Sequence, residues 1–246
     1  ATAPRVLDRQ GGLLRQGLSP DGTRGTWIPL SDISPWLVTA TLVAEDRRFR
    51  EHPGVDVLSA LRAARDNAGS GRRVSGASTV TMQLVKLLRP RPRTWGTKLE
   101  EAVLALRLER ALSKDQILEQ YLNRAPYGGN FVGIEAAAER TFGKPARELS
   151  PAEAALLAGL PQSPARLDPL RHLDRARRRQ RWILDEMHRL GQLENDDYRR
   201  SLWEVLRLEV RPVPCEASSF VDWVLRPGDR DVRTTLDGAL QREVEG

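Results

Sequence analysis

The sequence is poor in the residues that build disulfide or metal scaffolds, and it has no long hydrophobic run. One cysteine, Cys215, and three histidines are present, which excludes an intrachain disulfide, and these residues show no metal-ligand spacing. The longest apolar stretch, Ala152 to Leu160, contains Glu153 and is well short of the roughly 18 apolar residues of a membrane-spanning helix. We therefore expect no disulfide-stapled, zinc-stabilised or integral membrane architecture.

What the 246-residue chain has instead is a globular composition, 40% apolar and 29% charged, with apolar residues recurring at helical spacing. Lys and Arg number 39 against 33 Asp and Glu, a net charge of +6, which favours an acidic partner such as nucleic acid, anionic lipid or a phosphorylated substrate. The chain begins without Met and stops inside a helical pattern. We expect it to be a fragment of a longer protein, with any signal peptide or anchor outside it.

Cap and turn signals predict a mainly α-helical fold. A short hairpin is expected at Val6 to Leu14, and β-like alternation returns after Leu208. Helices are expected over residues 34–50, 57–68, 79–88, 97–112, from 113 onward, and over 133–142, 151–158, 173–190 and 196–206. Capping boxes are expected at Thr97/Glu100, Ser113/Gln116 and Ser150/Glu153. We divide the chain into an N-terminal segment (1–30), a helical domain (31–207) and a linker with the start of another domain (208–246).

One carboxylate, Glu45, interrupts an apolar helical face. On a continuous helix this face consists of Val38, Leu42, Glu45, Phe49 and His52. Desolvation there would raise the pKa of Glu45 and let it exchange protons near neutral pH. The alternative is a surface glutamate paired with Arg48 at i+3, and Asp46 has a similar alternative with Arg50 at i+4.

Two further segments carry candidate binding groups. The stretch Gly76 to Lys86 starts a helix with small and hydroxylated residues and stacks Thr79, Gln83 and Lys86 on one face, which suits a phosphate or sugar hydroxyls. Ordinary capping and a solvated Lys86 are the alternative. Glu101 begins another apolar stripe, where a first-turn glutamate favoured by the helix dipole is the alternative.

Five ordered motifs resemble those of the family 51 peptidoglycan glycosyltransferases. In chain order they are Glu45 to Gly54 (EDRRFREHPG), Gly76 to Lys86 (GASTVTMQLVK), Lys98 to Glu109, Lys114 to Asn123 (KDQILEQYLN) with Phe142-Gly143-Lys144, and Glu153 to Pro161 (EAALLAGLP). Residues 124–129 and 160–164 are similar to the 1C-type class A penicillin-binding proteins, and Val232 to Asp237 looks like the start of their transpeptidase region. The order of the motifs makes the resemblance specific.

The resemblance implies a lysozyme-like helical domain that polymerises lipid II into β-1,4 glycan strands, with inversion and release of undecaprenyl pyrophosphate. By this carry-over Glu45 is the general base for the acceptor hydroxyl and Glu101 is a second carboxylate near the leaving group. The substrate-binding residues that the resemblance implies are Asp46, Phe49, His52, Ser78, Thr79, Gln83, Lys86 and Lys98. The two lysines would neutralise charge on the departing pyrophosphate.

The same resemblance implies partners and a location. The partners are lipid II, the growing glycan strand, the membrane surface, moenomycin-type inhibitors and other cell-wall synthesis proteins. Nucleic acid is not expected, because the arginines are scattered without an aromatic platform. No cofactor or resident metal is required, although a divalent cation is compatible with the reaction. The domain is expected on the periplasmic face of the cytoplasmic membrane, with a single-pass anchor outside this chain.

Four positions depart from the family pattern: Thr97 replaces the usual Arg, Leu87 an Asn, Met82 a Gln and Ala77 a Gly. These changes bear on turnover and pyrophosphate affinity more than on the fold. A glycan-cleaving enzyme of the same fold is the competing interpretation, and it would need an acid but no lysines for a lipid pyrophosphate.

Residues 175–181 carry five arginines. Their angular spread is typical of a solvated helix with snorkelling side chains, and a lipid-phosphate patch is the alternative. We expect membrane contact instead at Val57 to Ala68 and the Gly69 to Gly71 loop, between the first two motifs.

Overall fold

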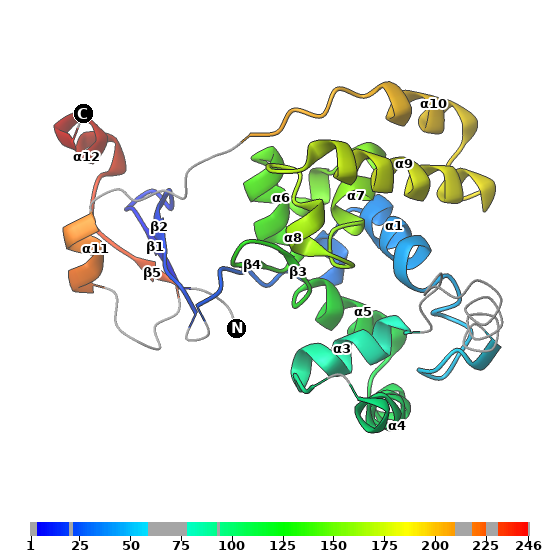
Figure 1. The fold of residues 1–246 in the computed structure, drawn as a ribbon. Coiled ribbons are helices and arrows are strands. Elements are labelled where there is room, and N and C mark those ends of the chain that lie inside the picture. Colours follow the sequence, from blue (N-terminus) through cyan, green and yellow to red (C-terminus); the bar gives the residue numbers. More distant parts are fainter. Residues whose placement is uncertain are drawn as a thin grey trace.

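The structure, a computed structural model, describes residues 4–19, 22–58, 78–92, 94–209, 218–224 and 231–245. It is mainly helical with a few short strands, which confirms the predicted fold class (Figure 1). Within these ranges no helix combines the length and the apolar character needed to cross a bilayer.

The main core is built around α7 (Pro151–Ala158), whose residues from Ala152 onward are all buried. Helices α1 (Pro35–Glu45) and α9 (Leu173–Arg189) pack against it, and α10 (Asn195–Trp203) packs on α9 and α7. Four of the eight α7 residues are alanine, so neighbouring helices approach closely. Immediately after it, a Cβ on Gly159 would lie 2.7 Å from Arg179 Cγ, which places α9 directly over the end of α7.

A second group of helices contains α3 (Val80–Leu88), α4 (Trp95–Ala111) and α5 (Lys114–Leu122), in the lower part of Figure 1. Helix α3 packs against both α4 and α5. Its Val80 and Leu84 belong to the main core, whereas Met82 and Val85 form a separate cluster with Ala105 of α4. Helix α3 therefore links the main core to α4.

The remaining elements are short. They are α6 (Ile134–Phe142), α8 (Pro164–Leu167), α11 (Ser218–Val224), α12 (Gly238–Glu245), 3-10 turns at Leu30–Asp32 and Ala146–Glu148, and a hairpin of β3 (Pro126–Gly128) and β4 (Phe131–Val132). Helix α6 ends at Gly143, which has a left-handed conformation (φ 68°) that glycine adopts without a steric cost. The predicted boxes Ser113/Gln116 and Ser150/Glu153 are both confirmed at the starts of α5 and α7.

The predicted N-terminal hairpin is confirmed and gains a third strand. Strands β1 (Arg5–Leu7) and β2 (Leu13–Gln16) pair antiparallel, and β5 (Val232–Arg233) pairs parallel to β1. Ion pairs Arg5–Asp231 and Arg9–Asp237 join the same two segments. Residues from both ends of the chain thus share one sheet, while the division at residues 30 and 207 stays a prediction.

The helix expected over residues 34–50 ends earlier, at Glu45. Asp46 leaves the helical conformation (φ −162°, ψ 80°), and its carboxylate accepts a hydrogen bond from Val80 N, the first residue of α3 (3.0 Å). A contact 34 residues away in sequence therefore ends the helix, although the apolar pattern continues through Phe49, which is buried in a turn.

The capping box expected at Thr97 is wrong, because α4 begins two residues earlier. Thr94 is the N-cap, and its side chain accepts from Thr97 N (3.1 Å). The Gly69 to Gly71 loop, Gly76 and Ala77 lie outside the described residues, as does most of the helix expected from Val57 to Ala68.

Candidate active site

Glu45 is the last residue of α1, and one oxygen of its carboxylate is held by α3. Oε2 accepts a hydrogen bond from Gln83 Nε2 of α3 (2.7 Å). Oε1 is buried and has no hydrogen-bond partner within the described part of the chain. One carboxylate oxygen is therefore positioned by the protein, and the other has no partner among the described residues.

Burial raises the pKa of Glu45, and the negative charge of Asp46 adds to this, while the Gln83 hydrogen bond and the Arg179 charge oppose it. The surface alternative is wrong, because Arg48 pairs with Glu51 (2.8 Å) and Asp56 (3.2 Å) rather than with Glu45. The sequence-based expectation of a desolvated carboxylate with a raised pKa is confirmed.

Two buried tyrosines and one arginine complete the surroundings of Glu45. Tyr121 of α5 donates to Gln83 Oε1 (3.3 Å), which orients the amide so that its Nε2 faces Glu45. The Tyr127 hydroxyl is buried without a partner among the described residues, and burial, followed by the charge of Glu45, raises its pKa. Arg179 of α9 donates to Ala44 O (3.2 Å). Sequence reasoning missed these three residues, which converge from α5, the β3 hairpin and α9.

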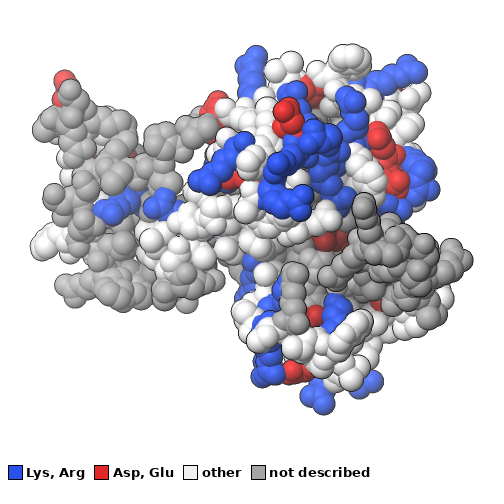
Figure 2. Space-filling view, viewed as in Figure 1, with Lys and Arg blue, Asp and Glu red and all other residues white. Residues whose placement is uncertain are grey.

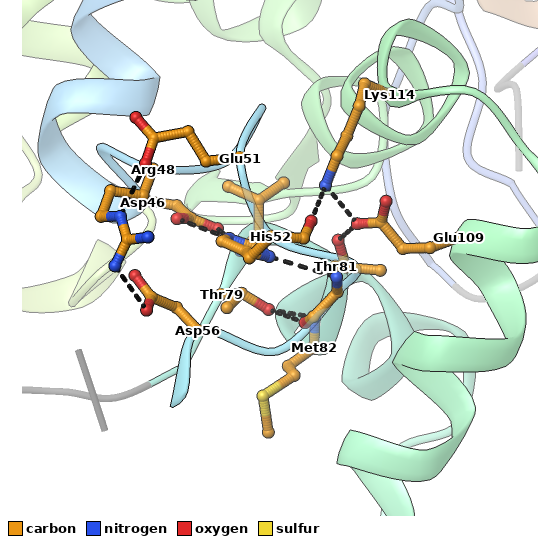
Figure 3. A network of polar contacts seen from close by, with 12 residues as sticks. Asp46, Arg48, Glu51, His52, Asp56, Thr79, Thr81, Met82, Glu109 and Lys114 are labelled. Atoms are coloured by element: carbon orange, nitrogen blue, oxygen red, sulfur yellow. Dashed lines mark hydrogen bonds and ion pairs between the residues drawn. The ribbon is translucent and has the colours of Figure 1, made fainter. Parts of the chain in front are cut away.

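Asp46 and His52 form a buried pair beside the base (Figure 3). His52 Nδ1 accepts from Gly54 N (3.1 Å), so Nε2 carries the proton and donates to Asp46, 3.0 Å from each carboxylate oxygen. The alternative pairing of Asp46 with Arg50 is wrong, because Arg50 pairs with Asp115 (2.8 Å). The Asp46 carboxylate thus ties the turn after α1 to the start of α3.

Thr79 has both hydrogen-bonding roles occupied within the protein. Its hydroxyl donates to Gly54 O (2.6 Å) and accepts from Met82 N (3.1 Å), which makes it the N-cap of α3. Gly54 has φ +103°, and a Cβ there would lie 2.8 Å from Ala105 O, so the first motif packs directly on the backbone of α4. A contact from Thr79 to substrate stays a prediction.

A second network of polar contacts joins the first motif to α4 and α5, and it was not predicted from the sequence (Figure 3). Lys114 Nζ donates to His52 O (2.6 Å) and to Glu109 Oε1 (2.8 Å), and lies 4.4 Å from the Phe49 ring centroid. Thr81 donates to the same Glu109 oxygen (2.5 Å). The two networks fix the first motif against α3, α4 and α5. Phe49 is fully buried among them.

The predicted cations fall into two environments. Lys98 of α4 donates to Ser78 Oγ (2.5 Å) and lies 3.5 Å from Glu101 Oε2. The structure therefore brings Lys98 and Glu101 of α4 together with Ser78, which precedes α3. Lys86 is exposed and makes no hydrogen bond or ion pair with the described residues. It lies one turn beyond Gln83 on α3, on the same side of that helix. Its contact with a leaving group stays a prediction.

Among the described residues, no group of three or more His, Cys, Asp or Glu side chains is arranged to hold a metal ion.

The comparisons with known proteins identify the family of this chain. A family model described as Transglycosylase matches residues 11–188, which is most of the chain. The chain belongs to the transglycosylase family. The expectation of a family 51 peptidoglycan glycosyltransferase domain of the class A penicillin-binding type is thus confirmed. The matched residues contain the whole α1–α3 site and most of α9.

Relatives of this transglycosylase domain include penicillin-binding protein 1C of Escherichia coli (strain K12), 42% identical over 225 residues, which are 90% of this chain and 29% of that protein. The biosynthetic peptidoglycan transglycosylase of Salmonella arizonae is 44% identical over 166 residues, 67% of this chain and 69% of that protein. The chain thus spans less than a third of the penicillin-binding protein that it matches.

A solved structure supports the fold. Penicillin-binding protein 1A from Haemophilus influenzae covers 99% of this chain with a TM-score of 0.52 at 21% identity, and the matched part is 28% of that protein. At this identity the likeness bears on the fold alone.

Proposed function

We propose that this domain polymerises lipid II into β-1,4 glycan strands, using the growing strand on undecaprenyl pyrophosphate as donor. The observation that carries the proposal is the Glu45 carboxylate, in which one oxygen is bonded to Gln83 and the other is buried without a partner among the described residues. A carboxylate with a raised pKa and a free oxygen suits proton abstraction from an alcohol near neutral pH.

In the proposed reaction, Glu45 takes the proton of the 4-hydroxyl of the GlcNAc of lipid II. The hydroxyl oxygen forms a bond to the anomeric carbon of the donor from the face opposite the pyrophosphate. The bond from that carbon to the phosphate oxygen breaks, so the configuration inverts and undecaprenyl pyrophosphate leaves with the electron pair. Lys86 and Lys98 neutralise the leaving group, and Glu101 holds Lys98 in place (3.5 Å).

Incubation of the domain with fluorescent lipid II in detergent, followed by electrophoresis of the glycan, tests this function. Polymer that disappears when moenomycin is added is the expected result. Shortening of preformed glycan strands, without polymer from lipid II, would instead identify a glycan-cleaving enzyme of the same fold.

Replacing Lys86 with glutamine should lower turnover by about 10²–10³-fold, the cost of removing one preorganised group that stabilises developing charge. Lys86 is exposed and makes no hydrogen bond or ion pair with the described residues, so the melting temperature should be nearly unchanged. Lys86→Arg is the matched control, because it keeps the charge and should retain most of the turnover. Equal rates for Lys86→Gln and the wild type would make Lys86 a solvated charge.

We also propose that the domain lies at the periplasmic face of the cytoplasmic membrane and that α4 contacts this membrane. Its residues Trp95, Leu99, Val103 and Leu106 follow helical spacing and are exposed, Trp95 by 92% and Leu99 by 69%. Aromatic and aliphatic side chains in a row suit the headgroup and acyl boundary of a bilayer. This surface lies on the same helix as Lys98 and Glu101, close to where a lipid-linked pyrophosphate would enter.

Sedimentation with phospholipid vesicles tests this contact. Trp95→Ser combined with Leu99→Ser should weaken binding at least tenfold, since burying each such side chain stabilises by about 1.5–3 kcal/mol. Trp203→Ser is the control, because Trp203 is 85% exposed on α10 and is not part of the α4 row. Equal loss in both variants would remove α4 as the contact.

A further inference from the structure

Buried side-chain polar atoms without hydrogen-bond partners gather around Glu45. Buried polar groups rarely lack a partner, because leaving one unsatisfied costs free energy. In the ranges that the structure describes, the atoms of this kind are Arg24 Nε, Thr41 Oγ1, Glu45 Oε1, Arg124 Nη1, Tyr127 Oη and Arg179 Nε. Glu45 and three residues around it supply four of these six atoms. Their concentration at one carboxylate indicates a function.

Thr41 lies one helical turn before Glu45 on α1. Long side chains of a helix point back toward its N-terminus, over the residue four positions earlier, so the Glu45 side chain extends toward Thr41. Thr41 is 1% exposed, and its hydroxyl has no partner among the residues that the structure describes. A hydroxyl that can donate or accept therefore lies beside the carboxylate.

Tyr127 of β3 brings a second hydroxyl of the same kind. It is 1% exposed and belongs to the main core, and its hydroxyl lacks a partner within the described ranges. Burial raises the pKa of Tyr127, and the charge of Glu45 adds to this, so the hydroxyl is within electrostatic reach of Glu45 and stays protonated. Tyr121 differs, because its hydroxyl is bonded to Gln83.

The charged groups that face Glu45 are Asp46, which follows it, and Arg179 of α9. The Asp46 carboxylate is already bonded to His52 and Val80, and the Arg179 guanidinium has only donors. Other basic side chains gather on the surface over α8 and α9 (Figure 2), where solvent and salt screen them. Of the unpartnered atoms around Glu45 in the described structure, only the two hydroxyl oxygens can accept a hydrogen bond from it.

The two oxygens of the Glu45 carboxylate differ in whether they can carry a proton. Oε2 accepts from Gln83 Nε2 (2.7 Å), a group that only donates, so a proton on Oε2 would face another donor. The Tyr121 hydroxyl fixes this orientation of the amide (3.3 Å). A proton taken up by Glu45 is therefore placed on Oε1, where the new O–H group is buried and needs an acceptor.

We propose that Thr41 and Tyr127 are positioning residues whose hydroxyl oxygens accept a hydrogen bond from Glu45 Oε1–H. This inference rests on the proposed function, in which the O–H bond of the acceptor sugar breaks and the Oε1–H bond forms. The contact stabilises the protonated product of that transfer and makes Glu45 a stronger base. When Glu45 is ionised, its carboxylate stays with Gln83, and the two hydroxyls lack a partner, as they do among the described residues here.

Steady-state polymerisation of fluorescent lipid II over a range of pH gives the first test. Thr41→Val and Tyr127→Phe remove the hydroxyls and keep the shapes of the side chains. Each should lower kcat by about 2–10-fold, the contribution of one neutral hydrogen bond, with KM unchanged. The rising limb of the rate should move to lower pH by up to about one unit, opposite to the direction expected for Gln83→Leu.

Two matched variants separate the loss of a hydroxyl from other effects. Thr41→Ser keeps the hydroxyl, so it should recover the wild-type limb and most of kcat. Tyr198→Phe removes a hydroxyl that is bonded to Asp185 (2.8 Å) outside the Glu45 site, and it should change neither kcat nor the limb.

Thermal unfolding gives a second test that does not depend on polymerisation. Above the raised pKa of Glu45 both hydroxyls lack a described partner, so Thr41→Val and Tyr127→Phe should be at least as stable as the wild type. Below this pKa the wild type gains a hydrogen bond, so the melting temperatures of the variants should fall relative to it as pH decreases. In a Glu45→Gln background the same substitutions should shift the melting temperature equally at every pH.

The outcomes separate this inference from the proposed function. A wild-type domain that makes no polymer would contradict the function, and thermal unfolding would still decide the hydroxyl contact. A limb that moves to higher pH would mean that the hydroxyls donate to the ionised carboxylate, and a raised KM with unchanged kcat would mean that they contact substrate. Either result, or a melting difference that does not change with pH, would overturn the proposal. Circular dichroism checks that each variant is folded.

Discussion

Replacing Glu45 with glutamine is expected to lower the initial rate of lipid II polymerisation by about 10²–10⁴-fold, the usual contribution of a general base. Glutamine has the same shape and can still accept from Gln83 Nε2, which now lies 2.7 Å from Glu45 Oε2. It cannot take up the proton of the acceptor hydroxyl. A folded variant that retains more than about a tenth of the wild-type rate would exclude Glu45 as the base.

The pH profile gives a second measurement on the same residue. Burial raises the pKa of Glu45, and the Gln83 hydrogen bond lowers it. The wild-type rate should therefore rise with pH through the raised pKa, because the base must be ionised. Gln83→Leu removes the opposing hydrogen bond and should move the rising limb to higher pH. Asp115→Ala, at an exposed pair away from Glu45, should leave the limb in place.

The raised pKa also predicts how stability depends on pH. A carboxyl group with a higher pKa in the folded state binds more protons there, so the free energy of unfolding decreases as pH rises from 4.5, its ordinary value, through the raised value. Glu45→Gln does not titrate and lacks this loss. The melting temperature of the variant relative to the wild type should therefore increase with pH over this window. A constant difference would contradict desolvation as the dominant cause.

Much of the fold was predictable because helix ends are encoded locally. Ser113 with Gln116, Ser150 with Glu153, and Gly143 each act within one turn of their own helix. The end of α1 was not predictable in this way. It depends on Asp46 accepting a hydrogen bond from Val80 N. The apolar spacing continues beyond Asp46, so the sequence pattern alone predicts a longer helix.

In the candidate site, too, local features were predictable from the sequence and long-range contacts were not. The apolar stripe around Glu45 predicted its burial, and the raised pKa agrees. The orientation of Gln83 by Tyr121 and the position of Arg179 depend on contacts between residues 38 or more apart. Sequence spacing within one helix carries no information about such partners. Gln83 and Tyr121 lie within the motifs and Arg179 does not, and no motif indicates how these residues pair.

Asp46→Ala is expected to destabilise the domain by about 2–6 kcal/mol, because two buried donors lose their acceptor and each unsatisfied group costs about 1–3 kcal/mol. The donors are Val80 N and His52 Nε2, both 3.0 Å from Asp46. Against a typical total stability of about 5–15 kcal/mol, this loss is large. Polymerisation should fall as well, since Asp46 holds the start of α3 and hence Gln83 against Glu45.

Asp46→Asn separates the structural contribution from the loss of charge. Asparagine keeps one oxygen that can accept from Val80 N, but its amide would face His52 Nε2–H, donor against donor. We therefore expect urea denaturation to rank stability as wild type, then Asp46→Asn, then Asp46→Ala. The control is Asp115→Ala, whose pair with Arg50 is exposed on both sides and should contribute at most about 1 kcal/mol. If Asp46→Ala cost no more than Asp115→Ala, the buried Asp46–His52 pair would not be what joins α1 to α3.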